Sequence, residues 1–285
     1  MKLPQKTFGN KGEDLIMITE DADICDEEYA RKYGIDKLID FSIQQDTGIS
    51  GSVDADFTDP FAPKIHDLVR LHRLCLGRKV TTVLEFGCGY SSLVFAHALQ
   101  INSLKHGEFV RENLRRHDCF EVHSVDDMPD YIKLAADRTP EELRPFAHFH
   151  KSAVNMTRFN ARICTEYDVL PNICPDLVYL DGPSQHAATG TVNGITTAHP
   201  DRLPMSCDLL KIEHFFLPGT LIIVDGRTAN ARFLKLNFQR QWAYRHDEIS
   251  DVHYFELQEA ALGKYNKLQL EFCLGSKWLL GQDVS

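Results

Sequence analysis

Residues 83–92 read VLEFGCGYSS, and this short stretch decides the fold class. The apolar segment 81–87 predicts a buried strand, and the residues after the turn predict a helix over 91–102, capped by its first serine. Gly87 and Gly89 lie in the turn between them, where a residue without a Cβ atom lets the backbone approach a ligand. A strand, a glycine-rich turn and a helix N-terminus together predict a nucleotide-binding corner.

The composition limits the kinds of function open to the chain. Its 285 residues, 43% hydrophobic and 25% charged, suit one large α/β domain with additions. A net charge of −10 argues against a non-specific nucleic-acid binder and against docking on an anionic membrane. Eight cysteines without a CxxC pair predict reduced thiols, and neither a signal peptide nor an apolar run of about 18 residues is present. We therefore expect a cytoplasmic protein.

Strands and helices alternate along most of the sequence. Helices are predicted over 26–41, 64–77, 91–102, 128–137, 207–216 and 231–242, and strands over 81–87, 120–127, 175–183, 218–227, 251–258 and 267–275. This order predicts a seven-stranded, mostly parallel, doubly wound sheet closed by an antiparallel C-terminal pair. Residues 146–154 and 161–167 both look extended, so the sequence leaves the third core strand open.

Two irregular regions flank this pattern. Residues 1–60 are acidic and irregular, and we expect them to form an N-terminal accessory segment, a lid or an oligomer contact. Residues 61–285 then form the main domain. The polar stretch 184–204 is predicted to be a long loop, and together with the N-terminal segment it would enclose a substrate.

Acidic residues follow several of the predicted strands. Asp126, Asp181 and Asp225 each end a probable core strand, and Glu85 comes near the end of a fourth. Ligands of doubly wound sheets bind beyond the carboxyl ends of the strands, so these side chains should meet at one edge. A dinucleotide site would require a third glycine where Tyr90 and two serines follow, and a pyrophosphate suits an acid at position 85 poorly.

The ordered set of motifs resembles the class I S-adenosylmethionine-dependent methyltransferases. VLEFGCGYSS is similar to their motif I, HSVDD to the acidic end of the second strand, and PDLVYLDGP and PGTLIIVDGR to the fourth- and fifth-strand motifs. The closing antiparallel pair resembles the sixth and seventh strands, which distinguish that fold from the NAD-binding type. The resemblance covers roughly residues 64–275 and implies the Rossmann-like methyltransferase fold, methyl transfer as activity and S-adenosylmethionine as cofactor.

The resemblance also implies which residues bind the cofactor. Glu85 would hold the methionine amino group through water, and Asp126, with Asp127 as the alternative, would accept the ribose hydroxyls. For the adenine, Ser152 or Glu166 could be the partner. The residues of the turn that would lie against the cofactor are Gly87, Cys88, Gly89, Tyr90 and Ser91.

The acceptor side is less defined by sequence. His186 is the candidate base for a hydroxyl acceptor because its ordinary pKa lies near working pH, and Asp181 would orient it or bind the acceptor. Arg227 is predicted to bind an anionic acceptor such as an acidic sugar. We expect a small-molecule or glycan acceptor, because the motif after Asp181 is not that of the nucleic-acid methyltransferases. The sequence leaves open whether the chain forms a homo-oligomer.

Alternatives remain for the chemistry. Asp181 and Asp225 could bind Mg²⁺ as in some sugar O-methyltransferases, although Gly226 stands where those enzymes offer another acid or Asn. An aminopropyl-type transferase would use a decarboxylated cofactor with the same fold. A non-catalytic cofactor-binding or scaffold protein would keep the fold and lose the acceptor chemistry.

Overall fold

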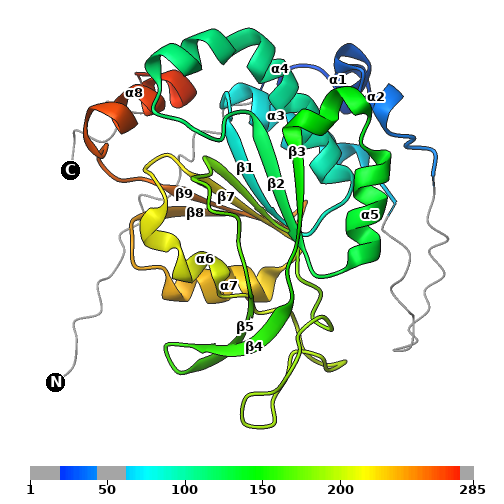
Figure 1. Ribbon diagram of the computed structural model, residues 1–285, viewed down its shortest axis with the longest axis vertical. Helices are drawn as coiled ribbons and strands as arrows, with labels where there is room; N and C mark the ends of the chain where they lie inside the picture. Colours follow the sequence, from blue (N-terminus) through cyan, green and yellow to red (C-terminus); the bar gives the residue numbers. More distant parts are fainter. Residues whose placement is uncertain (1–19, 44–61, 277–285) are drawn as a thin grey trace.

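A seven-stranded sheet forms the centre of the computed structural model, which describes residues 20–43 and 62–276 (Figure 1). The strands lie in the order β3-β2-β1-β6-β7-β9-β8. Five of them are parallel, and β9 runs antiparallel to both β7 and β8. Their bounds are β1 Thr82–Phe86, β2 Glu121–Asp126, β3 Ala147–Lys151, β6 Leu177–Leu180, β7 Leu221–Asp225, β8 Trp242–Asp247 and β9 Val252–Leu257. The predicted fold class, a doubly wound sheet with a closing antiparallel pair, is confirmed.

Helices cover both faces of this sheet. Their bounds are α1 Asp26–Tyr33, α2 Ile35–Leu38, α3 Ile65–Gly77, α4 Tyr90–Asn113, α5 Pro129–Arg138, α6 Asp208–Lys211, α7 Thr228–Asn237 and α8 Gly263–Leu274. Short 3₁₀ helices span Glu141–Phe146 and Glu213–Phe215. Within residues 20–43 and 62–276, no helix combines the length and the apolarity that crossing a bilayer demands.

Side chains of the central strands point alternately to the two faces of the sheet, so the core consists of two apolar clusters. Val83, Tyr179 and Ile223 face the side of α1, α3 and α4, where they join one apolar cluster. Leu84 and Val224 face the side of α6 and α7 and join the second. Because parallel central strands are buried on both faces, they read as continuous apolar runs, which is why the sequence reveals them so clearly.

The N-terminal helices belong to the first of these clusters. Tyr29 and Ile35, in α1 and α2, are fully buried in this cluster, and the hydroxyl of Tyr29 lies 2.8 Å from the ring of His72 in α3. The predicted helix 26–41 is divided because Gly34 adopts a left-handed conformation with φ of 75°. A closing movement of residues 1–60 over a substrate stays a prediction, and residues 1–19 and 44–60 lie outside the described part.

The structure decides which segment is the third core strand. β3 supplies it, because Ala147–Lys151 pairs in parallel with β2 at the edge of the sheet. Residues 161–167 lie elsewhere: β5, Arg162–Tyr167, pairs with β4, Val154–Phe159, in a separate antiparallel hairpin. This hairpin projects away from the sheet beyond β3 (Figure 1). The extended appearance of both segments was therefore justified, but only one of them is in the central sheet.

The C-terminal strand pair forms from different residues than predicted. Residues 267–275 were predicted to be a strand and are helical in α8. The partner of β9 is instead β8, which begins at Trp242, so the predicted helix 231–242 ends earlier, with α7 at Asn237. The buried residues of α8 recur at spacings of three and four, a helical pattern that the alternating leucines and phenylalanine obscure. They are Asn266, Gln269, Leu270, Cys273 and Leu274.

Two further elements differ in detail from their predictions. The predicted helix 207–216 is a four-residue α6 followed by a 3₁₀ turn. Residues 184–204 are irregular, as expected, and they run beside the β4–β5 hairpin through a bridge between Asn155 and Thr189. The loop and the hairpin together extend the molecule below the carboxyl ends of β1, β2 and β3 (Figure 1).

Candidate functional site

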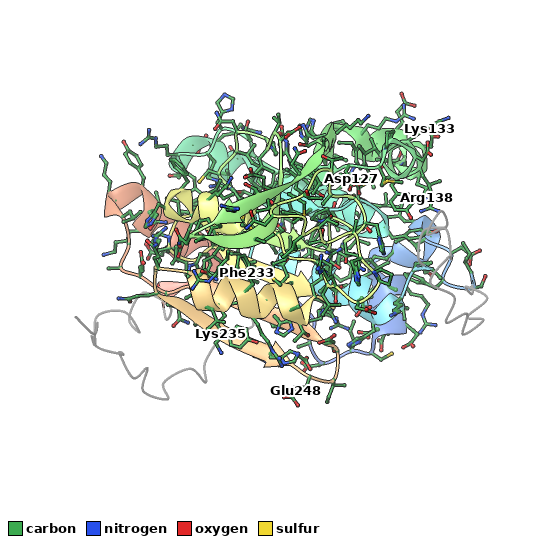
Figure 2. All side chains as sticks on the ribbon, turned by 90° about the horizontal axis from the view of Figure 1, so that it is seen from below. Asp127, Lys133, Arg138, Phe233, Lys235 and Glu248 are labelled. Atoms are coloured by element: carbon green, nitrogen blue, oxygen red, sulfur yellow. The ribbon has the colours of Figure 1, made fainter. Side chains whose placement is uncertain are left out.

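The carboxyl ends of the parallel strands bring four acidic residues to one edge of the sheet. Glu85 and Asp126 end or nearly end β1 and β2, Asp181 follows β6, and Asp225 ends β7. Figure 2 views the molecule from this side, with Asp127 between α5 and α7 in the projection. The predicted convergence of these strand ends is therefore present in the fold.

The turn after β1 packs tightly against the turn after β6. Gly87 has φ of 95° and donates its N–H to the carbonyl of Val125 at 2.8 Å. A Cβ atom at Gly182 would lie 2.5 Å from the nitrogen of Gly87 and 2.9 Å from the carbonyl carbon of Phe86. Two backbones can approach this closely only where both residues lack a side chain.

Gly89, in contrast, faces open space. It is the residue before α4, and a Cβ atom built on it meets no heavy atom within 4 Å. The first turn of this 24-residue helix carries no acidic residue of its own, so backbone N–H groups with a partial positive charge face this open side. Gly89 occupies the N-cap position of α4, so the prediction that Ser91 caps this helix is wrong.

Ser91 has another partner, the carboxylate of Glu85. Glu85 is 1% exposed and accepts hydrogen bonds from the hydroxyls of Ser91, Ser92 and Ser124, each at 2.5 Å. Burial raises the pKa of Glu85 to about 7, although the three hydroxyls favour its charged form. Glu85 thus lies beneath the glycine turn and fixes its position relative to α4.

The raised pKa of Glu85 predicts a pH-dependent stability. The folded protein retains a proton on Glu85 between its ordinary pKa of 4.5 and about 7, whereas the unfolded chain releases it. The free energy of unfolding should therefore fall as pH rises through this window, by up to about 3 kcal/mol from this group. Glu85→Gln should remove that part, measured as the difference between the two proteins in urea unfolding at about pH 5 and pH 8. An identical pH dependence in both proteins would contradict the prediction.

Asp126 lies directly against the glycine turn. Its Oδ2 accepts the N–H of Cys88 at 3.0 Å and its Oδ1 accepts the N–H of Met128 at 2.8 Å. Each carboxylate oxygen keeps a further lone pair for a ligand. Burial raises the pKa of Asp126, and burial together with the charge of Asp126 raises the pKa of Asp127 to about 6. Burial also raises the pKa of the Cys88 thiol, so this sulfur is protonated.

The remaining residues predicted for the cofactor have partners within the protein. The Tyr90 ring lies 4.3 Å from the guanidinium of Arg138. Ser152 is 4% exposed, and its hydroxyl accepts the N–H of Val169 at 2.9 Å. The alternative to Ser152, Glu166, lies in β5 and forms an ion pair with Lys211 at the end of α6.

Arg227 is bonded to the loop that carries Asp181. Its guanidinium donates to the carbonyl of Pro183 at 2.7 Å and to the carbonyl of Asp181, and its Nε lies 3.6 Å from the Asp181 carboxylate. Arg227 therefore holds the turn after β6 in place. Burial raises the pKa of Asp181 to about 6, although its side chain is 57% exposed and water limits that rise.

Asp225 contacts two residues, Tyr179 and Arg70, that no sequence motif marks as part of the site. It accepts the hydroxyl of Tyr179 at 2.5 Å, and the guanidinium of Arg70 lies 3.9 Å away. Arg70 belongs to α3 and resembles any charged residue of an amphipathic helix, so only the fold reveals this contact. A cation beside Arg70 would be repelled, and Asp181 and Asp225 therefore do not fit a Mg²⁺ site.

His186 lies in the loop that follows Asp181. It is exposed, and its backbone N–H donates to the hydroxyl of Ser184 at 3.3 Å. His186 follows the end of β6 by six residues, and its role as a base stays a prediction.

Sequence comparisons do not identify a family, whereas the strand order identifies the fold. No family model matches the chain, and no curated protein matches it. The class I methyltransferase arrangement differs from the NAD-binding type in having an antiparallel strand inserted beside the last parallel one, as β9 is here. The chain has the class I methyltransferase fold.

Solved structures with this fold are similar only remotely. The O-methyltransferase TomG from Streptomyces achromogenes, solved with SAM, is 14% identical over 85% of this chain and 92% of its own, with a TM-score of 0.38. An O-methyltransferase from Bacillus cereus, solved with SAH, is 10% identical over 81% and 90%, with a TM-score of 0.36. The Podospora anserina methyltransferase PaMTH1, also SAH-bound, is 10% identical over 68% and 79%, with a TM-score of 0.40.

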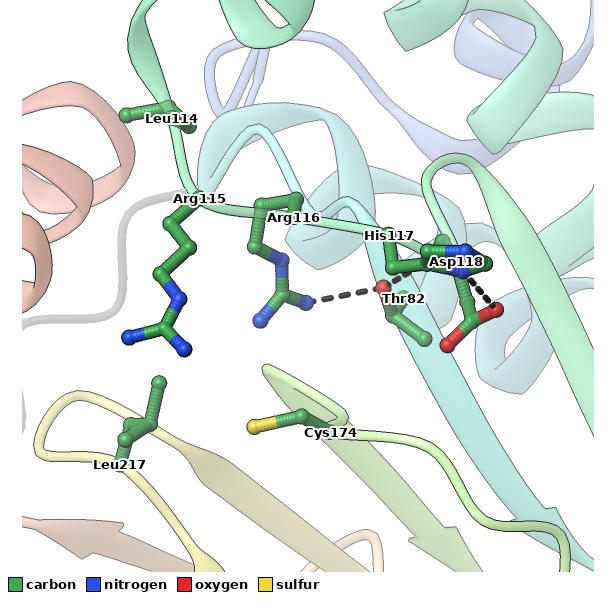
Figure 3. A pocket seen from close by; sticks show the side chains of 8 residues that line it. All are labelled: Thr82, Leu114, Arg115, Arg116, His117, Asp118, Cys174 and Leu217. Atoms are coloured by element: carbon green, nitrogen blue, oxygen red, sulfur yellow. Dashed lines mark hydrogen bonds and ion pairs between the residues drawn. The ribbon is translucent and has the colours of Figure 1, made fainter.

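A separate hollow of about 470 Å³ lies at the opposite edge of this methyltransferase fold. Figure 3 shows Arg115, Arg116 and Cys174 around it, with Arg116 bonded to Thr82 at 2.8 Å. Arg116 also lies 3.7 Å from Asp176, which in turn accepts the N–H of Thr82. The charges of Arg116 and Asp176 thus connect β1 to the start of β6, away from the carboxyl ends of the strands.

Proposed function

We propose that the chain is an S-adenosylmethionine-dependent methyltransferase that methylates an oxygen of a small or sugar-like acceptor. The observation that supports it most is the crowding of carboxylates around an open glycine turn at the N-terminus of α4. Burial raises the pKa of Asp126, Asp127 and Asp181, and neighbouring carboxylates add to the rise at Asp127 and Asp181. Such an edge attracts a cationic ligand and repels a pyrophosphate.

The residues present fit S-adenosylmethionine. This cofactor supplies a methyl group on a positively charged sulfur, and it also carries an ammonium group, a carboxylate and a ribose diol. The N-terminus of α4, next to the open side of Gly89, suits the carboxylate, and Asp126 has the lone pairs to accept the diol. Glu85 is engaged by three serine hydroxyls, so its part is to position the turn and to reach the ammonium group through water.

The chain's own residues would act on the acceptor in two ways. His186 would remove the hydroxyl proton as methyl transfer proceeds, and Asp181 would hold the acceptor in line with the methyl group. Arg227 braces the Asp181 loop through two carbonyl oxygens, so its contribution is to positioning, and contact with an anionic acceptor is secondary.

Titration calorimetry tests the cofactor. The protein should bind S-adenosylmethionine and S-adenosylhomocysteine but not NAD. Asp126→Asn should weaken both by roughly 10–100-fold, since it removes one charged acceptor of charge-assisted hydrogen bonds. Asp130→Asn, at the exposed start of α5, is the matched control and should bind as the wild type does.

The outcomes separate the competing functions. Failure of the wild-type protein to bind either ligand would refute the methyltransferase proposal and leave the fold alone. Preference for the decarboxylated cofactor would favour an aminopropyl-type transferase. Binding should be followed by a screen of sugar and phenolic hydroxyl acceptors with labelled methyl donor, in which we expect turnover without added Mg²⁺.

A further inference from the structure

Three side chains with metal-binding atoms converge on the outer strands of the sheet, away from the strand ends. Glu121 and His123 lie on β2, and His148 lies on β3 opposite His123 in the parallel register. Their carboxylate and imidazole atoms all lie within 4.8 Å of one another. All three lie on the same face of the sheet because positions 121 and 123 alternate with the buried Val122.

The spacing of these atoms resembles the edge of a metal coordination tetrahedron. Oε2 of Glu121 lies 3.1 Å from Nε2 of His123 and 3.5 Å from Nε2 of His148. Zinc–ligand distances of about 2.0–2.1 Å place neighbouring ligands of a tetrahedral ion about 3.3 Å apart. The two observed distances lie on either side of this value, so small side-chain movements would complete the geometry.

His148 has an unused ligand atom in this cluster. Its Nε2 is shielded from water and makes no hydrogen bond to any residue in the described ranges. The contact with Glu121 at 3.5 Å is too long for a hydrogen bond. A buried ring nitrogen without a hydrogen bond costs free energy, and a metal ion would remove that cost.

A fourth residue holds the central histidine in orientation. Nδ1 of His123 lies 3.0 Å from Nε2 of His150, the next residue on the same face of β3. The His123 ring also stacks on His148 and on His150, with ring centroids 4.8 Å and 5.2 Å away. Metal-binding histidines commonly donate their second ring N–H to an acceptor that fixes the ring orientation, and Nε2 of His150 is placed to accept the N–H of His123 in this way.

We propose that Glu121, His123 and His148 bind a divalent transition-metal ion, with Zn²⁺ as the chemical fit. Two imidazoles and one carboxylate are a zinc donor set that leaves a fourth position for water. His123 precedes Asp126 by three strand residues, about 10 Å, so the ion is separate from the cofactor edge. It joins the edge strand β3 to β2, and β3 leads into Ser152, whose N–H donates to the carbonyl of Asp126.

A second cluster in the described part of the chain is less suited to a metal. His246, Asp251 and His253 also bring ligand atoms within 4.8 Å. Both ring nitrogens of His253 are engaged by groups outside the cluster, the hydroxyl of Tyr244 at 2.9 Å and the hydroxyl of Thr228 at 3.0 Å, whereas Nε2 of His123 is bonded to Glu121, itself one of the proposed ligands. An ion there would have to displace one of these hydrogen bonds, so the first cluster is favoured.

Zinc binding to the tag-free full chain tests the proposal. The protein is stripped with a chelator, and Zn²⁺ affinity is measured by competition with a chromophoric chelator. We expect one ion per chain, a Co²⁺-substituted protein with the visible absorption of a tetrahedral site, and a raised unfolding temperature. His148→Gln and Glu121→Gln should each lose more than the roughly 10–100-fold typical of outer-shell changes.

Two controls make the result specific. His117→Gln replaces an imidazole that is 98% exposed, outside the cluster, and should leave affinity unchanged. His246→Gln tests the second cluster and should also bind normally. Unfolding temperatures without metal show whether each variant is folded. The proposal is overturned if wild-type protein binds Zn²⁺ no more tightly than His148→Gln and Glu121→Gln do, or if only His246→Gln loses the ion.

Discussion

Gly89→Val should abolish detectable binding of S-adenosylmethionine, a loss of more than about 100-fold, or about 2.7 kcal/mol. The reason is position: Gly89 precedes α4 at the open side of the glycine turn, where a Cβ atom meets no heavy atom within 4 Å. Its φ of 175° is extended backbone that valine also adopts. The added methyl groups would therefore occupy space that the proposed cofactor requires.

The same argument predicts little effect of Gly89→Val on folding. Glycine contributes no side-chain cap, so valine at the position before the helix should cost at most about 1 kcal/mol. Gly87→Ala is the contrasting variant, because φ is 95° and a Cβ atom would lie 3.2 Å from the nitrogen of Gly182. That substitution should lower the free energy of unfolding, whereas Gly89→Val should lower only affinity.

Calorimetry with S-adenosylhomocysteine and urea unfolding of both variants separate these effects. Wild-type affinity in Gly89→Val would place the ligand away from the turn and contradict the proposed site. A large loss of stability in Gly89→Val would show that the space around Gly89 is needed by the protein itself.

The strands that the sequence predicts most clearly are those buried on both faces of the sheet. β1, β6 and β7 are covered on both faces and read as short apolar runs that end in acids, so their order and the candidate site follow from sequence. β3 is an edge strand of intermediate exposure, and AHFHK carries no apolar run that would separate it from Arg162–Tyr167. β8 is likewise partly exposed at the other edge.

The sequence predicts that these strand-end acids meet at one edge of the sheet, but it does not predict their hydrogen bonds. The acids at the strand ends mark the edge, because strand direction alone places them there. That Glu85 is enclosed by three serines, or that Arg227 bonds backbone carbonyls, depends on atoms brought together from separate elements. Arg70 beside Asp225 depends on the packing of α3 on the sheet, for which the sequence contains no motif.

Arg78→Met should lower the free energy of unfolding by about 3–5 kcal/mol, the cost of removing one charge of a buried ion pair. Arg78 follows α3, is 3% exposed, and donates to Oε1 of Glu256 in β9 at 2.7 Å. It also donates to the carbonyl of Gly219, just before β7, at 2.7 Å. Glu256 is fully buried, so the substitution would leave a carboxylate in the core without its cation.

Urea unfolding of three variants distinguishes this explanation from a simple loss of packing. Arg78→Met combined with Glu256→Leu removes both charges and should recover most of the lost stability, because the desolvation cost disappears with them. Arg245→Met breaks an exposed pair with Asp247, 4.0 Å long, and should change stability by at most about 1 kcal/mol. If the double variant were as unstable as Arg78→Met, the hydrogen bond to Gly219 and the volume of the side chain, and not the buried charge of Glu256, would account for the cost.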